Sequence, residues 1–120
     1  MRALIVSDIH SNLTALEAVL TAAEDEGPID QLWCLGDIVG YGPWPVECIE
    51  RLRGLHALSI CGNHDAGATG RMSLDGFNHY AAQACRWTDN QLTSDSREYL
   101  ISLPETLEEE GFTFDYPLET

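Results

Sequence analysis

The sequence predicts an α/β fold in which three parallel strands alternate with two helices, in the order β-α-β-α-β. Three apolar runs of strand length alternate with two segments whose apolar residues recur at helical spacing. Each of the three runs ends in a short polar cluster that contains aspartate. Strands that alternate with helices pair in parallel through right-handed crossovers, so one parallel sheet flanked by helices is expected.

Turn and capping residues bound the elements of this unit. Gly27 and Pro28 end the first helix, and Pro45 opens the second at a position where a helix tolerates proline. The expected elements are a strand over 2–7, a helix capped by Ser11 or Asn12 that runs to Gly27, a strand over 30–35, a helix over 45–54 and a strand over 55–61.

The chain is less regular after the third strand. Residues 66–73 are rich in glycine and alanine and predict a loop. Apolar spacing then predicts a helix from about 77 to 90 and another, capped by Thr93 or Ser94, that ends before Pro104. One further strand is expected around 112–114. A length of 120 residues allows one domain, 1–120, without repeats or linkers.

The charge balance excludes some classes of partner. Twenty acidic residues against six basic ones, all arginine, give a net charge of −14. Binding to duplex nucleic acid or to an anionic membrane depends on Lys and Arg, so neither partner is expected. No apolar run reaches transmembrane length, and no secretory signal pattern opens the chain. The four cysteines form no C-x-x-C pair and are expected to be buried free thiols, which favours a cytoplasmic location.

The polar clusters at the strand ends carry the groups that bind metal ions. In an extended chain Asp8 and His10 point to the same face, Asp37 follows the second strand and Asn63 follows the third. The carboxyl ends of parallel strands meet at one sheet edge. Carboxylate, imidazole and amide groups gathered there predict a metal site. His64 is expected to point away from the ligands, which suits a proton donor or a charge stabiliser.

This set of donor groups favours a site with two metal ions that hydrolyses a phosphoester. The two oxygens of Asp37 can contact two ions about 3.5–4 Å apart, an arrangement used for phosphoryl hydrolysis. Mixed nitrogen and oxygen ligands suit manganese, iron, nickel or zinc. Tyr41, on a glycine-rich loop, and Arg71, after the third cluster, are weaker candidates for substrate binding. Asp65 is expected to support His64 or to cap a turn, and a role as a replacement ligand is the further alternative.

The three clusters resemble a known family. Their order and spacing, D-x-H, then G-D, then G-N-H-[DE], are similar to those of the calcineurin-like metallophosphoesterases. The loop Gly40-Tyr41-Gly42-Pro43 resembles that of a small prokaryotic branch of this family. The resemblance implies that Asp8 and His10 hold a first metal ion, that Asp37 bridges two ions, that Asn63 holds the second and that His64 is catalytic. It further implies hydrolysis of a phosphomonoester or phosphodiester by a metal-bound hydroxide, on a small phosphorylated substrate such as a nucleotide-like compound.

The sequence also departs from that family. Members supply further histidine ligands downstream, two of them in a G-H-x-H motif, and this chain has no such motif. Where a strand ending in histidine is expected, the chain reads Asp115-Tyr116-Pro117. The chain therefore resembles the first half of the family's sheet sandwich. The alternative function is a non-catalytic, truncated or degenerate scaffold. A half sandwich exposes a sheet face and an unpaired edge, so a homo-oligomer is expected.

Overall fold

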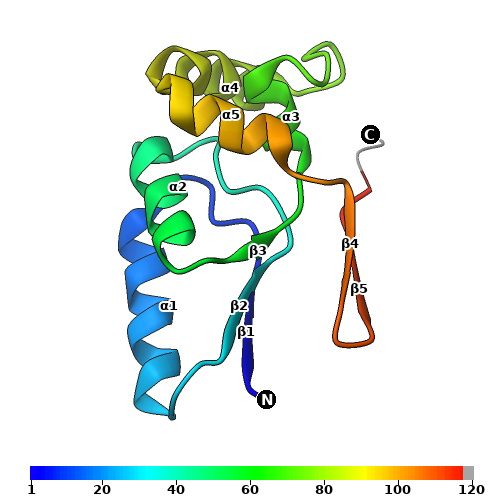
Figure 1. The fold of residues 1–120 in the computed structure, drawn as a ribbon. Helices are drawn as coiled ribbons and strands as arrows, with labels where there is room; N and C mark the ends of the chain where they lie inside the picture. Colours follow the sequence, from blue (N-terminus) through cyan, green and yellow to red (C-terminus); the bar gives the residue numbers. More distant parts are fainter. Residues whose placement is uncertain (118–120) are drawn as a thin grey trace.

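The computed structural model describes residues 1–117, so the last three residues of the expected domain, 118–120, lie outside the described part. Strands β1, β2 and β3 form a parallel sheet in that order, with a helix in each connection (Figure 1). The expected β-α-β-α-β unit is therefore confirmed. Its elements are β1 (Ala3–Val6), α1 (Leu13–Asp25), β2 (Gln31–Cys34), α2 (Pro45–Gly54) and β3 (Leu58–Ser59).

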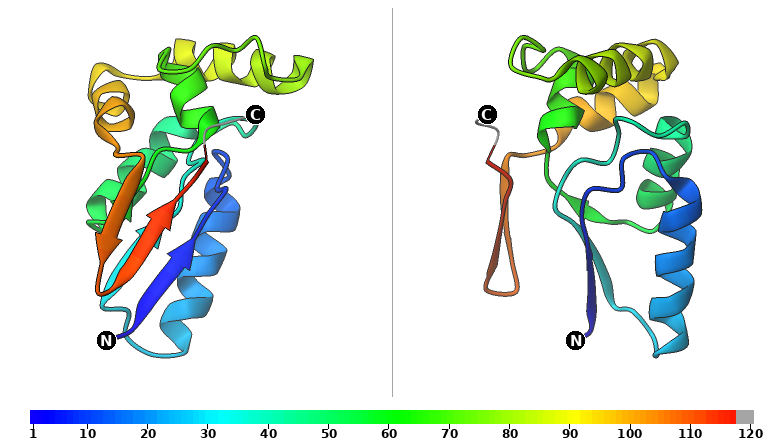
Figure 2. Two further views of the ribbon diagram at one scale, coloured as in Figure 1. Left: turned by 90° about the vertical axis from the view of Figure 1, so that its right-hand side faces the viewer. Right: turned by 180° about the vertical axis from the view of Figure 1, so that it is seen from behind.

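The remaining elements cover the top and the second face of this sheet. Helices α1 and α2 lie on one face, a β4–β5 hairpin lies over the other, and α3, α4 and α5 sit above the carboxyl ends of the strands (Figures 1 and 2). The hairpin is an antiparallel sheet of its own. These elements are α3 (Asn63–Thr69), α4 (His79–Gln91), α5 (Ser94–Ser102), β4 (Thr106–Glu109) and β5 (Phe112–Asp115).

Side-chain alternation along β2 separates two apolar clusters. Leu32 and Cys34 point into the cluster formed with α1 and α2, whereas Trp33 points into the cluster under the hairpin. In the second cluster the ring of Trp33 lies 4.9 Å from that of Phe114, whose side chain is buried. The hairpin is therefore anchored to the sheet by aromatic packing, although the two sheets share no strand.

Two differences from the sequence prediction concern the segment after β3. The strand is shorter than expected, because the N–H of Cys61 leaves the sheet and donates to the carbonyl of Pro104 over 2.8 Å. The expected loop over 66–73 is wrong in its first part, where helix α3 runs from residue 63 to 69. Asp65 stabilises the start of this helix by accepting the N–H of Gly62, and Gly70 ends it in the left-handed conformation.

The third difference is the hairpin, since one strand was expected and two are present. Glu110 and Gly111 form its tight turn, and both have positive φ angles, 51° and 81°. This pair of left-handed residues matches the twist of a two-residue hairpin. Leu107 faces Phe114 across the pair and packs with it on the main sheet. Each strand has only four residues, and acidic residues lie beside the turn. The alternation of apolar and polar residues is therefore too short to indicate two strands from the sequence.

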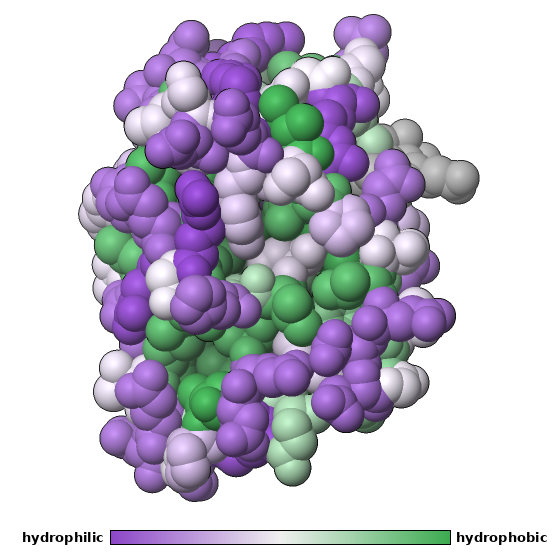
Figure 3. All heavy atoms as spheres, in the orientation of Figure 1, coloured by the Kyte–Doolittle hydropathy of each residue, from purple (hydrophilic) through white to green (hydrophobic). Residues whose placement is uncertain are grey.

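Apolar residues also gather at the lower end of the sheet, far from the polar clusters (Figure 3). A cavity of about 500 Å³ opens there between α1 and the first residues of β2 and β3. Its lining is mixed, with Leu20, Leu32 and Leu58 among the apolar residues and Glu24 and Glu109 among the charged ones. Among residues 1–117, no helix has the length and apolar character needed to cross a membrane.

Candidate metal centre

The loops that follow β1 and β2 lie side by side at the carboxyl end of the sheet. The N–H of Asp8 donates to the carbonyl of Gly36 over 3.0 Å. The N–H of His10 donates to the carbonyl of Asp37 over the same distance, 3.0 Å. These bonds extend the parallel pairing past the ends of the two strands. They therefore set the positions of Asp8 and His10 relative to Asp37.

The residues at this point have unusual backbone conformations. Asp8, His10 and Asp37 have positive φ angles of 56°, 48° and 56°. Residues other than glycine rarely adopt this region, and such strained positions cluster at functional sites. The expectation that Asp8 and His10 lie on extended backbone is wrong, since β1 ends at Val6. Their side chains reach a common point through tight turns and not through strand alternation.

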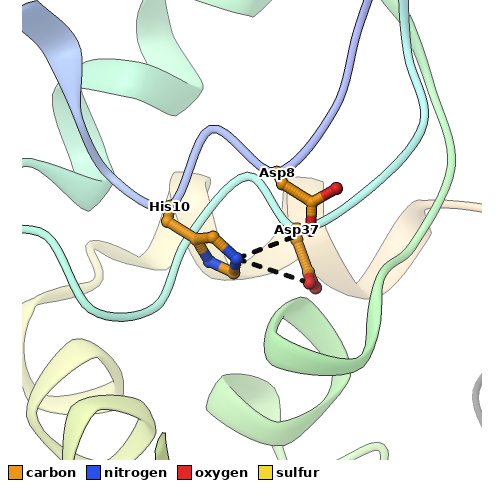
Figure 4. A group of neighbouring side chains, drawn as sticks. All are labelled: Asp8, His10 and Asp37. Carbon is orange, nitrogen blue, oxygen red and sulfur yellow. Dashed lines mark ion pairs between the residues drawn. The ribbon is translucent and has the colours of Figure 1, made fainter. Parts of the chain in front are cut away.

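The side chains of Asp8, His10 and Asp37 converge on one point (Figure 4). Nε2 of His10 lies 3.5 Å from Oδ1 of Asp8 and 3.7 Å from Oδ2 of Asp37. One nitrogen and two carboxylate oxygens thus lie within 4.8 Å of one another. Asp37 is buried whereas Asp8 is exposed, so the point is accessible from the side of Asp8.

The orientation of the His10 ring suits a metal ligand. Its Nδ1 lies 3.0 Å from the carbonyl oxygen of Val39, which is a place for the Nδ1 proton. Nε2 then faces the two carboxylates, where a divalent ion could be held by all three side chains. A backbone carbonyl that orients the ring is the usual support of a metal-binding histidine. The donor set therefore fits one divalent ion.

Asp37 is held by contacts on both of its oxygens. Oδ1 accepts the backbone N–H of His64 over 2.9 Å, and Oδ2 accepts the hydroxyl of Tyr116 over 2.6 Å. Burial raises the pKa of Asp37, while these hydrogen bonds and the nearby imidazoles of His64 and His10 act in the opposite direction. A bound cation would stabilise the ionised form further.

Asp65 connects the loop of Asp37 to helix α3. It is fully buried and accepts the backbone N–H groups of Asp37, Gly62 and Val39 over 2.9, 2.9 and 3.1 Å. Burial raises its pKa to about 7, against the opposing effect of these hydrogen bonds. Of the roles left open by the sequence, the structure shows the cap, at the start of α3. Asp65 also fixes the backbone that carries Asp37.

His64 lies beside the cluster and is nearly buried. Its ring centroid is 4.8 Å from those of His10 and Tyr41 and 5.5 Å from that of Phe77. Burial lowers the pKa of His64, and the carboxylate of Asp37 opposes this effect. A Cβ atom at Gly40 would collide with the imidazole, so a glycine there allows the close approach. His64 thus lies packed beside His10, next to the point where the three ligand candidates converge.

Comparisons with known proteins agree with this geometry. A sequence model described as calcineurin-like phosphoesterase matches residues 1–115. The chain belongs to the calcineurin-like phosphoesterase family. The crystal structure of a metallophosphoesterase from Sphaerobacter thermophilus superimposes with a TM-score of 0.77 at 51% identity, over 94% of this chain and 45% of that one. The predicted family and α/β fold class are confirmed.

Two curated relatives extend the comparison. An uncharacterised protein of Methanocaldococcus jannaschii is 50% identical over 105 residues, which cover 88% of this chain and 43% of that protein. A symmetrical bis(5'-nucleosyl)-tetraphosphatase of Psychromonas ingrahamii is 39% identical over 67 residues, covering 54% of this chain and 24% of that enzyme. The chain thus spans less than half the length of each of these two relatives. Divalent metal ions are the cofactors of this family.

In this calcineurin-like site, Asn63 has a hydrogen-bond partner that the sequence did not predict. Its Oδ1 lies 2.9 Å from the hydroxyl of Tyr116, the same hydroxyl that contacts Oδ2 of Asp37. Burial and the carboxylate of Asp37 raise the pKa of Tyr116. The one signal in the sequence was position, because Tyr116 follows strand β5, where the resemblance to the family implies a strand ending in histidine.

The two weaker candidates have different surroundings. Tyr41 is 54% exposed and has a positive φ angle of 60°, and its ring lies 5.1 Å from that of His10. It therefore lies exposed beside the imidazole of His10. Arg71 instead donates to the carbonyls of Leu100 and Leu103 at the end of α5, over 3.2 and 3.0 Å. These bonds favour a structural role for Arg71 over the phosphate-binding role expected from the sequence.

Proposed function

We propose that this chain carries the first half of the active site of a metal-dependent phosphoesterase, which hydrolyses a phosphomonoester or a phosphodiester. The observation that carries the proposal is the convergence of Asp8, His10 and Asp37, with one donor atom from each within 4.8 Å of the others. Divalent ions supply water activation and charge neutralisation in such hydrolysis. The family match supports the reaction class.

His64 is the proposed catalytic residue. It is close enough to the cluster to contact a phosphoryl group held there, and its backbone is fixed by the bond from its N–H to Asp37. The ring can donate a proton to the leaving oxygen or stabilise negative charge that develops on phosphorus-bound oxygens. The exposed ring of Tyr41 lies at the accessible side, where it can contact the rest of the substrate.

The two-ion arrangement expected from the sequence has two positions for divalent transition-metal ions. The first position uses Asp8, His10 and Asp37, and the second uses Asp37 and Asn63. The residues present fit the first ion, but the Tyr116 hydroxyl lies between the two donors of the second. Manganese, iron, nickel and zinc all suit these nitrogen and oxygen ligands.

A small phosphorylated substrate of the nucleotide class is the favoured ligand. Support comes from the tetraphosphatase of Psychromonas ingrahamii, whose name states that it acts on bis(5'-nucleosyl) tetraphosphates, and which is 39% identical over 67 residues. The aromatic ring of Tyr41 beside the cluster offers a stacking surface for a base.

Hydrolysis by matched histidine variants tests this proposal. With Mn²⁺ added, the chain should cleave an aryl phosphodiester and a dinucleoside tetraphosphate, and His64→Asn should lower kcat about 100-fold. His79→Asn is the control, because His79 is exposed at the start of α4. Bound Mn²⁺ should be equal in both variants. Equal kcat in His64→Asn and the wild type would contradict the role of His64.

One observation favours the second candidate, a non-catalytic binding domain of the same fold. The hydroxyl of Tyr116 contacts Asp37 and Asn63, which the two-ion mechanism needs for its second ion. The same assay separates the two candidates. Tight metal binding without turnover of either substrate would support the binding domain and contradict the enzyme.

We also propose that the protein self-associates in the cytoplasm. The cavity beside the edge strand β3 has apolar residues such as Leu20 and Leu58 in its lining together with charged ones, and Ile5 of β1 and Phe112 of β5 are 52% and 60% exposed. Sedimentation equilibrium should give a dimer or a larger species, and a monomer at every concentration would contradict the proposal. The four buried free cysteines support a reducing compartment.

A further inference from the structure

The hydroxyl of Tyr116 lies between two donor groups that approach it from different loops. It is 2.6 Å from Oδ2 of Asp37 and 2.9 Å from Oδ1 of Asn63. An ion shared by these two oxygens would lie about 2.0–2.3 Å from each. The hydroxyl oxygen thus takes up the space between the donors and also satisfies the buried carboxylate that an ion would neutralise.

Asp37 has few remaining positions for a second ion. Oδ1 accepts the N–H of His64, and Oδ2 lies 3.7 Å from Nε2 of His10 and 2.6 Å from the Tyr116 hydroxyl. The first ion fits between Oδ2 and His10. The Tyr116 hydroxyl occupies the approach to the same oxygen that is shared with Asn63.

The hairpin holds Tyr116 at this place. Two residues earlier, Phe114 is buried against Trp33, which anchors β5 on the sheet. The ring of Tyr116 packs on the backbone of Gly36, where an added Cβ would lie 3.1 Å from its Cδ2 atom. The side chain is therefore placed by packing at both ends, the ring against Gly36 and the hydroxyl against Asp37.

We propose that Tyr116 closes the second metal position, so that this chain binds one divalent ion, at Asp8, His10 and Asp37. The inference rests on the metal centre of the proposed function, but it does not require turnover. Removal of the tyrosine side chain opens the position between Asp37 and Asn63. Tyr116→His should place a nitrogen donor beside this position, because imidazole is shorter than phenol by about 2 Å, close to the length of a metal–nitrogen bond.

Metal stoichiometry tests this inference. Mn²⁺ bound per chain is measured by equilibrium dialysis, and electron paramagnetic resonance detects spin coupling between adjacent ions. The wild type should bind one uncoupled ion, whereas Tyr116→Ala and Tyr116→His should bind a coupled pair, the latter more tightly. Tyr80→Ala is the matched control, since Tyr80 is 76% exposed on α4, and it should still bind one ion. Circular dichroism checks that each variant is folded.

The outcomes separate this inference from the proposed function. A coupled pair in the wild type, or a single ion in both Tyr116 variants, would overturn the closing role of Tyr116 and leave the metal centre intact. A wild type that binds no ion would contradict the metal centre itself and this inference with it. The second ion in Tyr116→Ala should disappear when Asp37→Asn is added, which distinguishes it from Mn²⁺ bound loosely to the acidic surface.

Discussion

Asp37→Asn should weaken Mn²⁺ binding by at least about 100-fold, because it removes the charged oxygen that faces both His10 and Tyr116. The amide keeps the shape of the side chain and can still accept the N–H of His64. Without metal, we expect the variant to be at least as stable as the wild type, since it removes a buried carboxylate whose ionisation is costly. Isothermal titration with Mn²⁺ measures the affinity.

Asp75→Asn is the control for this substitution. Asp75 is exposed in the segment before α4, so its loss removes the same charge without touching the cluster. Its Mn²⁺ affinity should equal that of the wild type. An affinity for Asp37→Asn within threefold of the control would contradict the assignment of Asp37 as a ligand.

Asp65→Asn should lower the free energy of unfolding by about 3 kcal/mol, because one amide nitrogen would then face a buried N–H donor. Three backbone N–H groups, of Asp37, Gly62 and Val39, converge on the two oxygens of Asp65. Asparagine can accept with only one atom, so at least one of these donors loses its partner. Urea denaturation of the metal-free protein measures the change.

The stability and metal-binding effects of Asp65 should differ from those of Asp37. Asp65→Asn destabilises the protein without metal, whereas Asp37→Asn does not. The exposed control Asp75→Asn should leave the free energy of unfolding within about 0.5 kcal/mol of the wild type. A loss of less than about 1 kcal/mol in the free energy of unfolding of Asp65→Asn would contradict the claim that its three N–H contacts stabilise the fold.

Local patterns were sufficient to predict the first half of the fold. The helical spacing of Leu13, Leu16 and Leu20 and the position of Pro45 indicate helices that the structure contains with nearly the expected bounds. The convergence of Asp8, His10 and Asp37 was also predictable, because the end of a parallel strand places its residues at a known edge of the sheet.

Contacts between distant residues account for what the sequence did not predict. Tyr116 meets Asp37 across 79 residues, and no local pattern indicates that contact. The start of helix α3 depends on Asp65, whose carboxylate also reaches Val39, 26 residues away. The hairpin forms because Phe114 packs on Trp33, and its short strands are too weak a signal alone.

Anomalous X-ray diffraction from crystals grown with Mn²⁺ tests the central claim most directly, that this chain forms a metal site from its first two strand ends. We expect one anomalous peak about 2.0–2.3 Å from a carboxylate oxygen of Asp8, Nε2 of His10 and Oδ2 of Asp37. The Tyr116 hydroxyl should remain between Asp37 and Asn63. Peaks found only on the acidic surface, with none among these three side chains, would contradict the claim.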